Sequence, residues 1–264
     1  MTDKTCKKND RQYTNPQFDD SSLNGDKIEG RNPVIEAMRA GREIDKLFVR
    51  KSDVHTSLSR IVAMARDRGI VIIEAEKQKL DSMSETGVHQ GVIAFAACHA
   101  YVSVDAILAG ASQKGHAPLI VVCDKIADPH NLGSVIRSAN CFGADGVIIP
   151  KRNSVGLTAT VAKASAGAVE YMPVAKVTNI AQTLDLLKKK GLWIAGADMD
   201  GQSLRDADLS GPLAIVIGNE GEGIGRLVRE KCDFIVSIPM CGNVDSLNAS
   251  VAGGILLYEA SKRR

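Results

Sequence analysis

The chain has 264 residues, of which 44% are hydrophobic and 24% are charged, and its formal net charge is +2. This length and apolar content suffice for a full buried core and for two modest domains. The small positive charge does not by itself indicate nucleic-acid binding, which usually shows a larger or more clustered basic excess.

Residues 1–26 form the first distinct segment of the chain. They are rich in Lys, Asp, Asn, Ser and Thr, contain almost no aliphatic residues, and do not have the basic-then-apolar pattern of a secretion signal. A segment of this composition cannot bury enough apolar surface to offset the entropy of ordering. We predict a disordered tail.

Residues 27–99 alternate helical and extended patterns. A helix is expected from Asn32 as its N-cap, with Pro33 at the first helical position, to a stop at Gly41. Strands are expected at 46–49, 70–73 and 91–96, with apolar residues at helical spacing over 58–65. The alternation predicts a small α/β domain, followed by a linker over 100–117 with one short helix at 104–108.

Residues 118–264 repeat a strand–helix alternation on a larger scale. Strands are expected at 119–123, 146–149, 192–195, 213–217 and 234–238, and helices at 132–142, 158–168, 180–190 and 247–261. This βαβ pattern predicts an α/β domain with a mostly parallel sheet. Because the strands are apolar at both parities, helices should cover both faces of that sheet.

Membrane and metal-binding signals are missing from the sequence. No stretch approaches the eighteen or so uninterrupted apolar residues of a membrane span. The six cysteines have no CxxC or Cys/His ligand spacing, so no metal site is expected. Several of them lie in apolar runs, where cysteine behaves as a small hydrophobe. A reduced, cytoplasmic location fits this usage best.

Three polar loops each follow a predicted strand, and we expect them to form one site. They are 128–134 (Asp-Pro-His-Asn-Leu-Gly-Ser), 218–223 (Gly-Asn-Glu-Gly-Glu-Gly) and 238–252, where Gly, Asn, Asp and Ser crowd together before apolar periodicity resumes. Ligands of open α/β sheets bind outside the carboxyl ends of the strands. All three loops fall at that edge.

The glycine-rich loop 218–223 matches neither GxGxxG nor a P-loop. Its glycines allow the backbone to approach a ligand closely, while Glu220 and Glu222 would repel phosphates. A cofactor with a positive centre and few phosphates suits the loop, and S-adenosylmethionine meets that description. The alternative is an acidic turn that opens a helix, where the two carboxylates complement the helix dipole.

The helix expected after the first loop has one polar face. Leu132, Val135, Ile136 and Ala139 share a helical stripe, and Arg137 lies well away from it, where it can reach an open pocket or remain solvated. His130 precedes this stripe, and we interpret it as a surface or capping residue because a general base needs a positioned partner.

These loops, in this order and at these distances, resemble motifs 1, 2 and 3 of the SpoU (TrmH) class of RNA ribose 2′-O-methyltransferases. Upstream, Gly30-Arg31-Asn32-Pro33 and Val88-His89-Gln90-Gly91-Val92 resemble the auxiliary domain of the branch that methylates a guanosine in 23S ribosomal RNA. The resemblance implies an L30e-like RNA-binding domain before a SPOUT-type domain with a trefoil knot. It also implies S-adenosylmethionine as cofactor and a homodimer with each active site at the subunit interface.

The resemblance carries over to individual residues. It implies catalytic roles for Asn131, Arg137, Glu220, Ser246 and Asn248, and cofactor-binding roles for Gly218, Ile238, Met240 and Leu247. An Arg side chain stays protonated because its pKa exceeds about 12, so Arg137 either orients the ribose hydroxyl or is deprotonated only transiently. Ser246 has an alternative role as the N-cap of the last helix.

The target RNA is less firmly indicated than the chemistry. A guanosine in 23S ribosomal RNA is expected because the auxiliary segment is present. One alternative is a transfer-RNA guanosine 2′-O-methyltransferase, since the catalytic domain is shared between the two classes. Another is a non-catalytic RNA-binding or ribosome-assembly protein, against which the intact motif residues argue.

Overall fold

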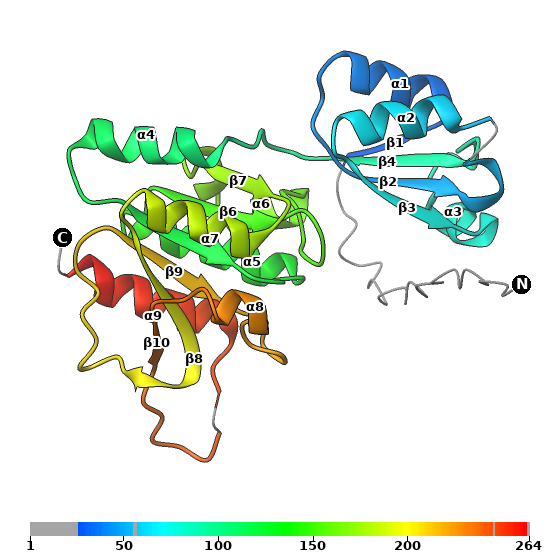
Figure 1. Ribbon diagram of the computed structural model, residues 1–264. Coiled ribbons are helices and arrows are strands. Elements are labelled where there is room, and N and C mark those ends of the chain that lie inside the picture. The colour runs from blue at the N-terminus through cyan, green and yellow to red at the C-terminus, as the bar shows by residue number, and fades with distance from the viewer. Residues whose placement is uncertain (1–25, 55–56, 245, 263–264) are drawn as a thin grey trace, which may run out of the picture.

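A computed structural model describes residues 26–54, 57–244 and 246–262. The tail predicted over 1–26 lies outside the described residues except for Asp26, which begins the first strand. The described chain forms two α/β units joined by an extended connection (Figure 1). We call the part from 26 to 96 the smaller unit and the part from 104 to 262 the larger unit.

The smaller unit is a mixed four-stranded sheet with helices on both faces. Its elements are β1 (Asp26–Glu29), α1 (Arg31–Arg39), β2 (Ile44–Arg50), the 3-10 turn η2 (Lys51–Asp53), α2 (Ser59–Asp67), β3 (Val71–Ala75), α3 (Lys77–Met83) and β4 (Val92–Ala96). The strand order is β1-β4-β2-β3, with β2 and β3 parallel and the other pairs antiparallel. Buried side chains of α1 and α2 pack on one face, and those of α3 pack on the other.

Helix α1 begins earlier than predicted. The N-cap is Gly30, with φ of 94°, so Pro33 occupies the third helical position instead of the first. The backbone N–H of Arg31 donates to the Oε1 of Gln90 at 3.0 Å, which satisfies one of the free amides of the first turn. A contact from a distant loop therefore sets this helix start.

The larger unit is built on a six-stranded sheet in the order β10-β8-β9-β5-β6-β7. Its elements are α4 (Val104–Lys114), β5 (Leu119–Cys123), α5 (Pro129–Cys141), β6 (Gly146–Pro150), α6 (Ala159–Ala164), η3 (Ala168–Glu170), β7 (Val174–Val177), α7 (Ile180–Lys189), β8 (Trp193–Ser203), β9 (Leu213–Ile217), α8 (Arg226–Arg229), β10 (Phe234–Ser237) and α9 (Ala249–Ser261). Every neighbouring pair of these strands is parallel. The predicted α/β class and mostly parallel sheet are confirmed.

Helices cover both faces of this sheet, as the apolar strands predicted. Side chains of α5, α6 and α9 form one core with alternate residues of the central strands, and side chains of α4, α7 and α8 form the second core with the others. In each of the strands β5, β6 and β9, all five residues are buried. Within the described residues, no helix has the length and apolarity needed to cross a bilayer.

Several helices of the larger unit differ from expectation, among them α4 and α9. The segment 100–117, expected as a linker with a helix at 104–108, contains the longer helix α4, whose Val104, Ile107 and Ala111 are buried. Helix α9 starts at Ala249 instead of Leu247, and its N-cap is Asn248. The alternative role of Ser246 as that cap is wrong, because the Asn248 side chain accepts from the backbone N–H groups of Ser250 and Val251.

Candidate active site

Three of the predicted catalytic side chains meet in one hydrogen-bond network. The Nδ2 of Asn131 donates to Oε1 of Glu220 at 2.9 Å, and the Nδ2 of Asn248 donates to Oδ1 of Asn131 at 2.9 Å. Asn248 also donates to the same Glu220 oxygen. The three loops that the sequence predicted to converge are therefore joined through their side chains.

Local capping places two members of this network. Asp128 caps α5 by accepting from the N–H of His130 at 2.9 Å, and Pro129 occupies the start of the helix. Asn131 follows in the first turn and is 8% exposed. Asn248 caps α9, so its Oδ1 is engaged by the helix while its Nδ2 faces the other two loops. The helix starts thus aim the two amides at Glu220.

The glycine-rich loop is folded tightly back on itself. Asn219 and Gly223 form an antiparallel bridge, and a Cβ atom on Gly218 would lie 2.2 Å from the carbonyl carbon of Gly223. The Asn219 side chain donates to the carbonyl of Lys125 at 3.2 Å and accepts from the N–H of Gly221 at 2.8 Å. Only glycine fits at position 218 without moving the backbone.

Residues after β5, which the sequence analysis did not single out, support this loop. The Oδ2 of Asp124 accepts from the N–H of Gly225 at 2.8 Å. Lys125 has a φ of 60°, an uncommon conformation for a residue other than glycine. Its hydrogen bond with Glu222 raises the pKa of Lys125 above its ordinary value. An acidic residue directly beyond a buried strand was the signal available in the sequence.

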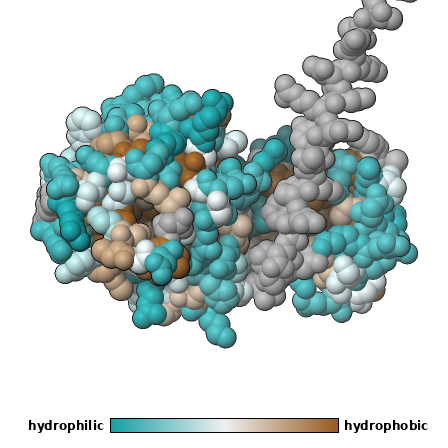
Figure 2. Space-filling model, turned by 90° about the horizontal axis from the view of Figure 1, so that it is seen from below, coloured by the Kyte–Doolittle hydropathy of each residue, from teal (hydrophilic) through white to brown (hydrophobic). Residues whose placement is uncertain are grey.

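A cavity of about 900 Å³ opens beside the network. It is bounded by the middle of β8, the loop after β9 and the segment after β10, and its described lining includes Gly218, Glu220, Ile238, Met240, Ser246 and Leu247. Apolar residues gather about a hollow on the face of the larger unit drawn in Figure 2. All four predicted cofactor-binding residues line this one cavity.

The charged side chains in the described lining of the cavity are all acidic: they are Asp198, Glu220 and Glu222. Arg229 pairs with Asp198 and Lys125 pairs with Glu222 from outside the lining, whereas Glu220, held by two neutral amides, keeps an uncompensated negative charge. A ligand with several phosphates would be repelled there, whereas one with a positive centre would be attracted. The volume lies within the usual range for small-molecule sites, and the lining mixes apolar side chains with backbone polar groups. These features suit a nucleoside that carries a cationic group.

Arg137 does not line this cavity. It lies on the exposed side of α5 and makes no hydrogen bond or ion pair within the described part of the chain. The buried stripe on the same helix is as predicted, with Leu132, Val135, Ile136 and Ala139 all 0% exposed. His130 is also exposed.

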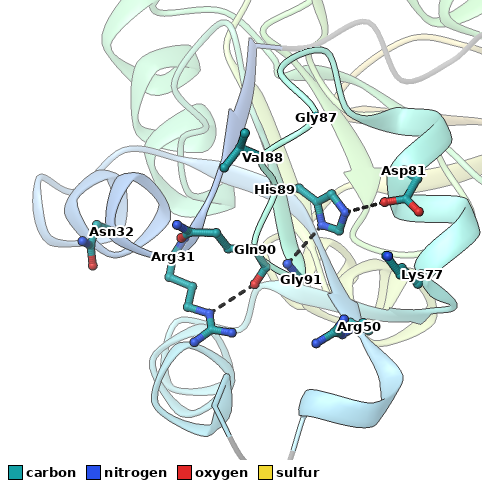
Figure 3. A pocket seen from close by; sticks show the side chains of 10 residues that line it. All are labelled: Arg31, Asn32, Arg50, Lys77, Asp81, Gly87, Val88, His89, Gln90 and Gly91. Atoms are coloured by element: carbon teal, nitrogen blue, oxygen red, sulfur yellow. Dashed lines mark hydrogen bonds and ion pairs between the residues drawn. The ribbon is translucent and has the colours of Figure 1, made fainter.

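A second cavity, of about 690 Å³, lies in the smaller unit (Figure 3). Arg31, Arg50 and Lys77 line it, and Asp81 is the one carboxylate among its described lining residues. His89 is 6% exposed and supports the wall: its Nδ1 accepts from the N–H of Gly91 at 3.0 Å, so Nε2 donates to Asp81 at 2.9 Å.

The loop that closes this second cavity is held in an uncommon conformation. Gln90 has a φ of 51°, and the Nε of Arg31 donates to its carbonyl at 3.1 Å. Val88 next to it is 65% exposed. The cavity therefore combines cationic side chains with an exposed apolar edge. Among the described residues of both units, no group of three or more His, Cys, Asp or Glu is arranged to hold a metal ion.

Family comparison assigns both units. Residues 118–258 match the SpoU rRNA methylase family, and residues 27–102 match the RNA 2′-O ribose methyltransferase substrate-binding family. A protein of Bacillus subtilis named for the TrmH family of tRNA/rRNA methyltransferases is 46% identical over 240 residues, which cover 90% of this chain and 96% of that protein.

Solved structures give the same result. An S-adenosylmethionine-bound rRNA methyltransferase from Sinorhizobium meliloti is 25% identical with a TM-score of 0.56, covering 89% of this chain and 86% of that one. A TrmH/SpoU tRNA-modifying enzyme of A. aeolicus is 29% identical with a TM-score of 0.51, but it covers only 56% of this chain and 76% of its own. The first similarity spans more of this chain than the second.

Proposed function

The chain belongs to the SpoU rRNA methylase family, and from that premise we propose that it transfers a methyl group from S-adenosylmethionine to the ribose 2′-hydroxyl of a guanosine in 23S ribosomal RNA. The observation that carries the proposal is the acidic, glycine-bounded cavity beside the Asn131–Glu220–Asn248 network. We propose that it works on RNA in the cytoplasm.

The cavity provides what this cofactor requires. When bound, S-adenosylmethionine supplies an electrophilic methyl group on a positively charged sulfur. The carboxylates in the wall favour that charge, and the backbone at Gly218, Ile238, Met240 and Leu247 offers donors and acceptors to an adenine edge. Ser246 lies in the same wall, where its hydroxyl is available to the methionine end or the ribose.

The network has a positioning role in this proposal. Glu220 holds the starts of α5 and α9 together, so the side chains that would contact the hydroxyl to be methylated keep fixed positions. In-line attack needs the reacting groups held at near-contact distance, and such positioning accounts for a large part of enzymatic rate enhancement. Arg137 then orients the hydroxyl and stabilises its developing negative charge.

We propose a homodimer because Arg137 lies outside the cavity of its own chain. Beside it, the outer face of α9 exposes Val251 (49%), Ile255 (37%) and Tyr258 (50%) at helical spacing. This stripe is apolar on a helix that is already buried on its other side, a pattern typical of an interface. A two-fold axis there would bring Arg137 of one subunit toward the cavity of the other.

The smaller unit is proposed to contact the RNA. Its cavity presents Arg31, Arg50 and Lys77, which suit phosphate oxygens, and the exposed Val88 suits a base or ribose (Figure 3). Ribosomal RNA is favoured over transfer RNA because the similarity to the rRNA enzyme spans 89% of this chain. The similarity to the tRNA-modifying enzyme, at 56%, is too short to include both family matches.

Parallel methyl transfer to two RNAs tests the proposal. Labelled S-adenosylmethionine is offered with in vitro transcribed 23S rRNA and with bulk tRNA, and the product is mapped by primer extension sensitive to ribose methylation. We expect one 2′-O-methylguanosine in 23S rRNA. Label in tRNA alone would replace the target by tRNA. Label in neither, repeated with immature ribosomal particles, would leave a non-catalytic RNA-binding role.

A further inference from the structure

A buried ion pair joins the two units. Asp45 of β2 in the smaller unit is 5% exposed, and its carboxylate pairs with Lys176 of β7 in the larger unit. The hydroxyl of Tyr101, from the connection between the units, donates to Oδ1 of Asp45 at 2.7 Å. The ammonium of Lys176 also lies 4.9 Å from the centre of the Tyr101 ring. Three parts of the chain therefore meet at one carboxylate.

The surroundings of Asp45 leave little room for another arrangement. A Cβ atom on Gly156 would lie 2.2 Å from Oδ2 of Asp45, so the larger unit fits around this side chain. That oxygen is buried and, among the described residues, has no hydrogen-bond partner. Burial and the negative charge of Asp45 raise the pKa of Tyr101 well above its ordinary value, so its hydroxyl keeps its proton.

The connection itself is attached to the larger unit on both sides of this pair. The Cys98 N–H donates to the carbonyl of Leu157 at 2.8 Å, and the Leu157 N–H donates to the Tyr101 hydroxyl at 2.9 Å. Val102 then forms a parallel bridge with Ala175 at the edge strand β7. The segment that could act as a hinge is thus fixed to the larger unit, and Asp45 gives the smaller unit a buried ionic contact with that unit.

We propose that Asp45, Tyr101 and Lys176 form an interunit lock that fixes the RNA-contacting smaller unit relative to the methyl-transfer cavity and so selects which nucleotide reaches that cavity. The inference rests on the proposed function. The cationic cavity and the methyl-transfer cavity belong to different units. A folded RNA held in the first presents one particular ribose to the second only while the orientation of the units is constant.

The physical reason for a lock is the cost of burying charge. Burying two ions away from water costs free energy that only a well-formed ion pair offsets. Removing one partner leaves a buried charge without compensation, which is stabilised when water reaches it. The units can hydrate that charge by moving apart. A surface ion pair would not have this effect, since water already solvates both partners.

The test uses the full chain with Lys176→Met, Asp45→Asn and their combination. Hydrogen exchange of the Cys98, Val102 and Leu157 amides and the radius of gyration from small-angle scattering report the interface. We expect each single variant to exchange these amides about tenfold faster or more and to expand, with a smaller effect in the double variant because neither Asp45 nor Lys176 is then left charged without the other. Additive effects of the two substitutions, or no change in either readout, would overturn the lock.

Lys151→Met is the matched control. Lys151 lines a cavity between the units together with Asp45, Tyr101 and Lys176, but among the described residues its Nζ bonds only to the Gly69 carbonyl, at 3.4 Å. Lys176→Met should lower kcat/KM for 23S rRNA about tenfold or more and spread methylation to other riboses, with cofactor affinity unchanged, whereas Lys151→Met should leave the methylated position unchanged. Equal effects of both would reduce Lys176 to a general RNA-binding charge. If the wild type methylates no RNA, the proposed function fails, but hydrogen exchange and small-angle scattering still test whether the ion pair fixes the two units.

Discussion

At the scale of single residues, one oxygen atom organises the site. Oε1 of Glu220 accepts from the side-chain amides of Asn131 and Asn248 and lies 3.4 Å from the N–H of Ala249. A carboxylate oxygen can accept several donors at once, and such charge-assisted bonds are about twice as strong as neutral ones. The negative charge of Glu220 is therefore needed to gather these donors, and its carboxylate also adds to the acidity of the cavity.

Glu220→Gln should lower methyl transfer about tenfold to a hundredfold, because each hydrogen bond to a charged group contributes about 1.5–3 kcal/mol. The Gln oxygen can still accept from Asn131 and Asn248, but these bonds are then neutral and weaker. Single-turnover transfer to 23S rRNA is the measurement. Glu222→Gln is the control, since Glu222 is exposed and pairs only with Lys125 at the surface. Equal losses in both variants would mean that total cavity charge, and not the network, matters.

At the scale of elements, the loop after β9 depends on the absence of one side chain. Gly218→Ala should weaken cofactor binding about tenfold or more while the protein remains folded, since the added Cβ forces Gly223 to move. Binding is measured by calorimetry with S-adenosylmethionine. At Gly221 of the same loop the nearest atom to a Cβ is 3.6 Å away, so Gly221→Ala should bind nearly normally. An unchanged affinity in Gly218→Ala would contradict this account of the loop.

A second element depends on pH. Glu29, at the end of β1, accepts hydrogen bonds from Ser84, from Thr86 and from the N–H of Glu85. Desolvation would raise its pKa, but these bonds prevail and lower the pKa of Glu29 from 4.5 to about 2. A depressed carboxyl pKa stabilises the fold fully above the unfolded value and loses that contribution as pH falls through the folded value.

The wild type should therefore lose stability between pH 4.5 and about 2, and Glu29→Gln should remove this part of the pH dependence. At neutral pH we expect the substitution to lower the free energy of unfolding by about 1 kcal/mol, given the partial exposure of the site. Urea unfolding of both proteins across this range is the measurement. A difference between them that stays constant down to pH 2 would rule out the role of Glu29.

How far the sequence predicts these elements depends on their burial. Strands β5 and β9 are buried on both faces and read as continuous apolar runs, so their bounds were predicted to the residue. Helix α3, with only Leu80 and Met83 buried, and the four-residue edge strand β7 give too weak a pattern and were missed. Strand β8 continues to Ser203 through polar residues because it pairs with β10, which no local pattern reveals.

The residues of the site likewise divide into those that the sequence predicted and those that depend on tertiary contacts. Loop composition and family motifs identified Asn131, Glu220 and Asn248 and placed them at one edge of the sheet. The caps that aim the two amides, Asp128 and Asn248, differ from the helix starts predicted at 132 and 247. The support from Asp124 and the φ of Lys125 depend on tertiary contacts and were not foreseen. The family motif assigned Arg137 to the site, whereas in a single chain Arg137 lies outside the cavity. The trefoil knot stays a prediction from the resemblance.

At the scale of the whole molecule, the distance of Arg137 from its own cavity has a direct test. If each site combines Arg137 of one subunit with the cavity of its partner, two inactive variants should complement each other. Arg137→Ala should abolish transfer while it binds cofactor normally, and Gly218→Ala, with its weakened cofactor affinity, should transfer little at a cofactor concentration well below its dissociation constant. In their heterodimer, the intact Arg137 of the second chain faces the intact cavity of the first.

Heterodimers purified through two different tags should therefore show about half of the wild-type activity per dimer, because one of the two sites is complete and the other is doubly defective. If Arg137 serves the cavity of its own chain, each site carries one substitution and the heterodimer is inactive. Sedimentation of the wild type as a monomer at micromolar concentration would refute the dimer itself. Val251→Glu, which places a charge on the apolar stripe of α9, should dissociate the dimer and abolish transfer without altering the fold of either unit.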